Sequence, residues 1–126
     1  MKKIFTTLLA LCLLNTASFS DVKLGIILGF TGPIESLTPD MAAGAELAID
    51  EINKSKHFSM GKVSGVRADS TCVDSAAATT AAERLITSDK VNGIMGADCS
   101  GVTTAILQQV AMANGVVMIS PSATSP

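Results

Sequence analysis

The chain has no tryptophan or tyrosine, and only four phenylalanines among its 126 residues. Only Phe30 and Phe58 lie beyond the first twenty residues, so the aromatic platforms on which single-stranded nucleic acids stack are missing. Runs of basic residues are also absent, and the eleven acidic residues outnumber the nine basic ones. Both absences argue against nucleic acid and an anionic membrane surface as partners.

Histidine is almost absent too, since His57 is the single one and lies in a polar connection, where we expect a solvated loop residue. No histidine base therefore accompanies the serine or cysteine motifs, as nucleophilic catalysis would need. The segment Gly29–Pro33 has the spacing Gly-x-x-Gly rather than a dinucleotide fingerprint, and the chain contains no P-loop. We therefore predict a non-enzymatic protein with no cofactor and no metal site. An exported α/β hydrolase or transferase is the weaker alternative.

The first twenty residues have the pattern of a secretory signal peptide. Two lysines precede an apolar stretch over residues 4–14, which is too short to span a bilayer. Ser18 and Ser20 supply the small residues of a cleavage site, so we predict removal of residues 1–20 by cleavage after Ser20. Leu11 before Cys12 is too bulky for a lipobox, which argues against a lipid anchor. We expect residues 21–126 to be exported and not embedded in a membrane.

Over residues 21–126, apolar runs of strand length alternate with stretches of helical periodicity. Strands are expected at 22–28, 63–68, 91–95 and 116–119. Helices are expected from the capping residues Thr38, Asp74 and Ser100 to about residues 52, 88 and 113. This βαβαβαβ order predicts an α/β fold, a doubly wound parallel sheet with helices on both faces. The helices are rich in alanine and would bury little area, so we expect an incomplete lobe with a marginal core.

Small and hydroxyl-bearing residues follow the last two expected strands, in Cys99–Thr103 and Ser120–Pro126. Ligands of open parallel sheets bind beyond the carboxyl ends of the strands, and a short right-handed crossover would place these two strands side by side. Backbone N–H groups after Ser100 would suit an anion. Ordinary capping and turn chemistry is the alternative. The expected contacts on this concave surface are Cys99, Ser100, Gly101, Ser122, Ala123 and Thr124.

Two cysteines, Cys72 and Cys99, remain after the predicted signal peptide. An even count in an exported chain suggests a disulfide, and we expect the two residues at the ends of adjacent strands. Two free buried thiols are the alternative.

These motifs together resemble the type I periplasmic binding proteins, specifically the leucine/isoleucine/valine-type substrate-binding subunits of ABC importers. The resemblance extends over residues 21–126 in an ordered series with fitting spacings. It is carried by Thr31-Gly32-Pro33, Gly44-Ala45, Ile49–Asn53, Asp69 with Cys72 and Asp74, Gly93–Gly96 leading into Cys99-Ser100, and Met118–Thr124.

The resemblance implies two α/β lobes joined by a three-stranded hinge and closing on a small ligand. Residues 21–126 would be most of the N-terminal lobe, incomplete at its C-terminal end. The ligand's carboxylate would lie against Cys99-Ser100 and its ammonium near Thr124, with Ser122 and Ala123 between them. The family's disulfide maps onto Cys72 and Cys99.

Two residues depart from the branched-chain pattern. Leu37 stands where such members can carry an aromatic that covers the ligand side chain, and Asp98 stands where they present an apolar residue. Asp98 would face a cationic or polar ligand group, or else turn into solvent. Polar amino acids, amides and urea therefore remain candidate ligands.

The resemblance and the export signal together predict a periplasmic solute-binding subunit that delivers an amino acid or related small solute to an inner-membrane ABC permease. A ligand-sensing domain of the same fold, in a receptor or regulator, is the alternative.

Overall fold

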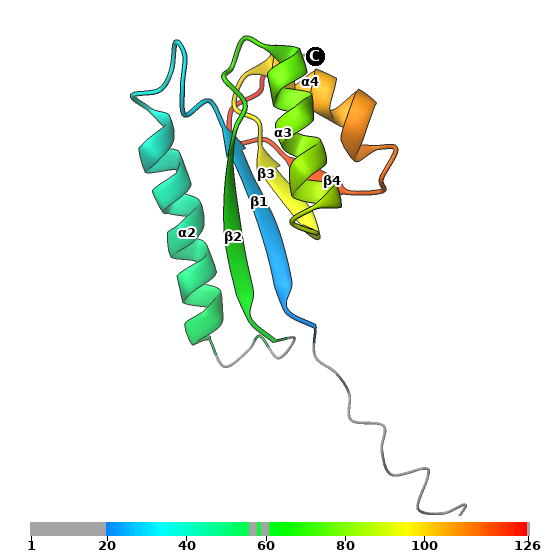
Figure 1. Ribbon diagram of the computed structural model, residues 1–126. Coiled ribbons are helices and arrows are strands. Elements are labelled where there is room, and N and C mark those ends of the chain that lie inside the picture. The colour runs from blue at the N-terminus through cyan, green and yellow to red at the C-terminus, as the bar shows by residue number, and fades with distance from the viewer. Residues whose placement is uncertain (1–19, 56–57, 59–60, 126) are drawn as a thin grey trace, which may run out of the picture.

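The computed structural model describes residues 20–55, 58 and 61–125, and at its centre lies a four-stranded parallel sheet (Figure 1). The strands are β1 (Val22–Leu28), β2 (Val63–Asp69), β3 (Gly93–Gly96) and β4 (Val117–Ile119), in the order β2-β1-β3-β4. Every pair is parallel, so the four carboxyl ends meet at one edge of the sheet. The predicted parallel sheet is confirmed.

Helices cover both faces of this sheet, as predicted. Helix α2 (Thr38–Lys54) lies on one face, whereas α3 (Ser75–Thr87) and α4 (Ser100–Ile106) lie on the other (Figure 1). The last helix does not continue regularly to residue 113 as expected, because α4 passes into a π-helical turn, η2 (Leu107–Ala111). Gly115, with φ of 64°, follows this turn at the predicted stop.

Strand β1 is one of the two inner strands, and its apolar residues face both layers. Ile26 and Leu28 belong to the cluster under α2, whereas Ile27 belongs to the cluster under α3 and α4. Burial on both faces explains the apolar run from Leu24 to Leu28. Gly25 lets α3 approach closely, because a Cβ there would lie only 2.9 Å from Leu85 Cδ1.

Two helix starts differ from the sequence-based expectation. The N-cap positions are Leu37 and Cys99, so Thr38 and Ser100 are the first helical residues and do not cap their own helices. The Thr38 hydroxyl instead donates to the Gly29 carbonyl at 3.1 Å, across the β1–α2 connection. Asp74 caps α3 as predicted, by accepting from two backbone N–H groups.

The buried sides of the helices were predicted only in part. Helix α3 buries Ala78, Ala82 and Leu85 as expected. Helix α2 buries Thr38, Ala42 and Ile49. Of the other residues that helical periodicity places on these faces, Met41, Ala45 and Ile86 are partly buried against the core. Ala48 and Ile52 on α2 and Ala113 after η2 are exposed instead.

The α2 face of the sheet is covered unevenly. Val117 and Ile119 on β4 are 69% and 70% exposed. Together with Leu24 and Met95 they line an apolar hollow of about 300 Å³ over β1, β3 and β4. The described helices therefore leave the β4 side of this face uncovered.

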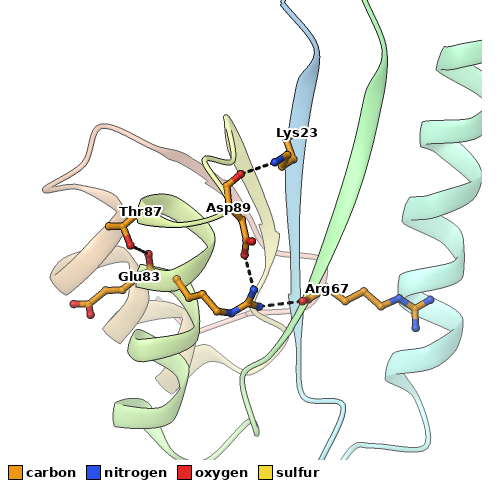
Figure 2. A network of polar contacts seen from close by, with 6 residues as sticks. Lys23, Arg67, Glu83, Thr87 and Asp89 are labelled. Carbon is orange, nitrogen blue, oxygen red and sulfur yellow. Dashed lines mark hydrogen bonds and ion pairs between the residues drawn. The ribbon is translucent and has the colours of Figure 1, made fainter.

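A polar network ties the end of α3 to the sheet (Figure 2). Lys23 Nζ donates to the Asp89 carbonyl at 2.7 Å. The Arg84 guanidinium pairs with the Asp89 carboxylate and donates to the Arg67 carbonyl at 3.3 Å. Lys23 is the second residue of β1, so this network anchors α3 at the edge of the sheet opposite to the strand carboxyl ends.

Among the described residues, no helix has the length and hydropathy of a membrane span. The same residues contain no group of three or more potential metal ligands. Residues 1–19 of the predicted signal peptide (residues 1–20) and His57 lie outside the described residues.

Candidate functional site

The loops that follow β3 and β4 lie side by side at the carboxyl edge of the sheet. Ser100 Oγ accepts hydrogen bonds from the backbone N–H groups of Thr124 and Ser125, at 3.1 and 3.2 Å. Strands β3 and β4 are neighbours in the sheet, as the short crossover predicts. The expected ligand contacts Ser100 and Thr124 are therefore brought together on one side.

The loop after β4 is folded around Ser120, whose role the sequence did not reveal. Its hydroxyl donates to the Ala97 carbonyl and accepts from the N–H groups of Ser122 and Ala123, at 3.3 and 2.8 Å. Ser122 Oγ in turn donates to the Asp98 carbonyl at 2.8 Å. These bonds fix the positions of Ser122 and Ala123 relative to the loop after β3.

The hydroxyls at this edge have complementary hydrogen-bonding capacity left. A serine hydroxyl offers one donor and two acceptor lone pairs. Ser100 Oγ already accepts twice, so its O–H is left to donate. Ser122 donates its proton within the protein, so its oxygen is left to accept. The exposed Thr124 hydroxyl has no protein partner within the described part of the chain.

Asp98 is buried at this edge, with 3% of its surface exposed. One carboxylate oxygen accepts from the Gly29 N–H at 2.9 Å, and the other accepts from Ser70 Oγ at 3.3 Å and the Cys99 N–H at 3.1 Å. The alternative that Asp98 turns into solvent is therefore wrong, because these donors hold it inside the protein. A contact between Asp98 and ligand stays a prediction.

The predicted disulfide joins Cys72 and Cys99, with a Cα–Cα distance of 5.2 Å. The expectation that it joins adjacent strands is wrong, because β1 lies between β2 and β3. The bridge therefore passes close to the end of β1 at Gly29. A Cβ on Gly29 would lie 3.2 Å from Cys72 Cβ and 3.3 Å from Asp98 Oδ2, so a larger residue would crowd both groups.

A second carboxylate, Asp69, fixes the turn after β1. Asp69 Oδ2 accepts from Thr31 Oγ1 at 2.6 Å, while Oδ1 accepts from the Thr71 and Thr31 N–H groups at 2.8 and 3.3 Å. Partial burial raises the pKa of Asp69, but the hydrogen bonds from Thr31, Thr71 and Phe30 together outweigh it and hold that pKa below its ordinary value. Asp69 therefore supports this turn as an anion.

A hollow of about 400 Å³ lies against α4 and the loop after β4. Ser100 and Ala123 are the predicted site residues that line it. Four of the lining residues, Ser100, Thr103, Thr104 and Leu107, have the spacing i, i+3, i+4, i+7, which places them on one face of the helix. The same spacing in the sequence would have identified Thr103, Thr104 and Leu107, which were not predicted as site residues. The full lining is Ser100, Thr103, Thr104, Leu107, Met118, Ser120, Ala123 and Ser125.

The other predicted contacts lie around this hollow or apart from it. Gly101, Ser122 and Thr124 are exposed on the two loops, and Cys99 is held by the disulfide. Leu37 is 61% exposed on the turn before α2 and does not line the hollow.

Similarity to known proteins identifies the family of this chain. Residues 21–126 match the sequence profile of the periplasmic binding protein family. The chain belongs to that family.

Curated relatives of this periplasmic binding protein chain include a Leu/Ile/Val-binding protein, BraC3, of Rhizobium johnstonii. It is 29% identical over 100% of this chain and 34% of its own length. A Leu/Ile/Val-binding protein homolog of Brucella abortus is 37% identical over 71% of this chain and 22% of its own length. The present chain thus spans about a third or less of the length of these relatives.

Solved structures of binding proteins share the fold. The branched-chain amino acid transporter substrate binding protein LivJ of Streptococcus pneumoniae, in complex with isoleucine, superposes with a TM-score of 0.75 and 31% identity, over 84% of this chain and 30% of its own. A solute binding protein of Rhodopseudomonas palustris in complex with benzoate has a TM-score of 0.70 and 26% identity, over 82% and 28%. These relatives are binding proteins rather than enzymes, as the sequence predicted for this chain.

Proposed function

We propose that this chain is the N-terminal lobe of a periplasmic solute-binding protein that captures an amino acid or a related small carboxylate for an ABC importer. Residues 1–20 would direct export, and residues 21–126 would form one wall of the ligand cleft. The observation that carries the proposal is the pair of hydroxyls at the carboxyl edge of the sheet. The Ser100 hydroxyl has only its donor left, and the Ser122 hydroxyl has only acceptor capacity left.

A zwitterionic amino acid matches this polarity. Its carboxylate would accept from Ser100, and the exposed N–H of Gly101 in the first turn of α4 adds a further donor. Its ammonium would donate to Ser122 and Thr124 on the neighbouring loop. The donor and acceptor sites lie on two loops that are hydrogen-bonded to each other, so their spacing is held before the ligand arrives.

The ligands of the solved relatives support the carboxylate half of this arrangement. Isoleucine, bound by the Streptococcus protein, and benzoate, bound by the Rhodopseudomonas protein, share a carboxylate but not an ammonium. We therefore infer that the Ser100 side of the edge is the common anchor and that the Ser122 and Thr124 side distinguishes amino acids from other carboxylates.

The remainder of the mechanism requires a second lobe. Small-molecule sites bury about 70–90% of their ligand, whereas the edge described here presents a single open wall. A ligand that contacts both lobes stabilises the closed form by its differential affinity. The closed form would then dock on the permease of the importer.

Calorimetry on the full-length protein tests the proposal with L-leucine, L-isoleucine, L-asparagine and benzoate as probes. Ser100→Ala should weaken every probe that binds, because each loses its carboxylate donor. Thr124→Val should weaken the amino acids about tenfold or more, since a hydrogen bond to a charged group contributes about 1.5–3 kcal/mol, and should leave benzoate unchanged.

Thr80→Val, which removes a hydroxyl that bonds only within α3, is the matched control and should leave every affinity unchanged. Unchanged amino-acid affinity in both site variants would contradict the proposed site. Failure of all four probes to bind the wild-type protein would contradict the proposed ligand class.

A further inference from the structure

Within the part of the chain that the structure describes, Asp98 is the one residue whose hydrogen bonds reach all four strand-end loops. Its carboxylate accepts from Gly29 at the end of β1, from Ser70 after β2 and from Cys99 after β3. Its backbone carbonyl accepts from Ser122 in the loop after β4. The carboxyl edge of the sheet is therefore built around this residue.

Burial makes the carboxylate of Asp98 depend on these hydrogen bonds. Asp98 is 3% exposed, and it takes part in none of the ion pairs found among the described residues. A buried carboxylate is costly unless donors satisfy it, and bonds to a charged acceptor are stronger than neutral ones. The Gly29 and Cys99 N–H groups, in turn, have Asp98 as their acceptor, so displacement of the carboxylate would leave them without it.

We propose that Asp98 is a positioning residue, whose carboxylate holds the loops after β1, β2 and β3 in the arrangement that presents Ser100 and Ser122 to the ligand. This inference rests on the proposed function, because it assigns the purpose of the arrangement to ligand capture. Both carboxylate oxygens are directed to protein donors. Asp98 therefore organises the site and does not supply a counter-charge to a cationic ligand.

The two carboxylate oxygens of Asp98 accept from different donors, so Asp98→Asn tests the proposal directly. Oδ2 serves Gly29, and Oδ1 serves Ser70 and Cys99. An asparagine side chain of the same shape has only one oxygen. In either orientation of the amide, one of the two backbone N–H groups loses its acceptor, so the variant loosens the loops without creating a cavity.

The first experiment measures amide hydrogen exchange by NMR in the ligand-free full-length protein. Asp98→Asn should speed exchange at Gly29 or Cys99 at least tenfold, because local opening no longer breaks a bond to a charged acceptor. Asp89→Asn is the matched control, since it makes the same substitution in the Arg84 network (Figure 2). It should leave the exchange rates of both amides unchanged. Equal exchange in wild type and Asp98→Asn at both amides would overturn the positioning role.

The second experiment measures affinity by calorimetry with L-leucine and L-lysine, well below the unfolding temperature of each variant. Asp98→Asn should weaken each ligand that binds by the same factor, about tenfold, and Asp98→Leu should weaken it further, whereas Asp89→Asn stays within twofold of wild type. Selective loss of L-lysine, or tighter L-leucine binding by Asp98→Leu, would overturn the proposal and make Asp98 a ligand contact.

The two experiments separate this inference from the proposed function. If the wild-type protein binds neither probe, the proposed function fails for both, yet the exchange rates still decide whether Asp98 holds the loops.

Discussion

At the scale of single residues, Asp69 shows how a strand-end carboxylate supports the site at a distance. Its anionic form accepts from Thr31 and Thr71, and these bonds outweigh the effect of burial, so its pKa in the folded protein lies below its ordinary value. A carboxyl with a depressed folded pKa contributes stability that is fully present above its unfolded pKa. That contribution is lost as the pH falls through the folded pKa.

Thr31→Val should therefore lower the free energy of unfolding by about 1 kcal/mol at pH 7, since it deletes a hydrogen bond to a partly exposed charged group. The difference from wild type should shrink below about pH 4, as Asp69 becomes protonated in both proteins. Urea unfolding at several pH values measures this. Thr79→Val, whose hydroxyl bonds only to carbonyls of its own helix, should show a difference that does not depend on pH. A difference for Thr31→Val that stays constant down to pH 3 would contradict the role of Asp69.

The sequence predicts where these helices begin more accurately than it predicts the hydrogen-bond partners of the hydroxyls found there. Thr38 and Ser100 stand at helix starts, and local pattern favours capping by both. In the structure each hydroxyl bonds to a partner that is distant in the sequence, the Gly29 carbonyl for Thr38 and the Thr124 and Ser125 N–H groups for Ser100. A local sequence pattern identifies only the N–H groups of the same helix as partners for these hydroxyls. The partners from other segments become available only when the chain has folded.

At the scale of elements, the disulfide joins the loop after β2 to the start of α4, across the end of β1. Its cysteines are 27 residues apart. Closing a loop of that length stabilises the folded state by about 3–4 kcal/mol in the chain-entropy description. The bond therefore matters for stability as well as for the shape of the carboxyl edge.

Reduction should lower the free energy of unfolding by about that amount, as measured by urea unfolding with and without dithiothreitol. The double variant Cys72→Ala/Cys99→Ala should be about as unstable as the reduced protein and insensitive to the reductant. A wild-type protein whose stability is the same under both conditions would show that the two thiols are not joined in solution.

Strands and helices were predictable to within a few residues, because alternating apolar runs and helical periodicity are local signals. Strand β1 was predicted with its full range, and the end of the last helix was not, because η2 contains no glycine or proline that would mark a change of helix type. The position of β1 between β2 and β3 is a property of the assembled sheet. The order of the elements along the chain does not determine this order of strands in the sheet.

At the scale of the whole molecule, one edge of the sheet carries the proposed site and one face of it is only partly covered. The hydroxyls of Ser100, Ser122 and Thr124 form an open wall, and the apolar hollow by β4 leaves Val117 and Ile119 largely exposed. The relatives are about three times longer than this chain. Both surfaces are therefore suited to contact with further parts of a larger protein.

A polypeptide of residues 21–126 should therefore bind amino acids weakly on its own. One wall leaves most of a ligand in water, whereas small-molecule sites bury about 70–90% of it, so we expect dissociation constants of about 1 mM or weaker for L-leucine and L-isoleucine. Calorimetry measures this, after circular dichroism has shown that the polypeptide is folded, and the full-length protein serves as the comparison. Micromolar binding by a monomer, with the mass checked by sedimentation, would show that this wall is sufficient by itself. Micromolar binding by a dimer would instead show that a second copy replaces the missing wall.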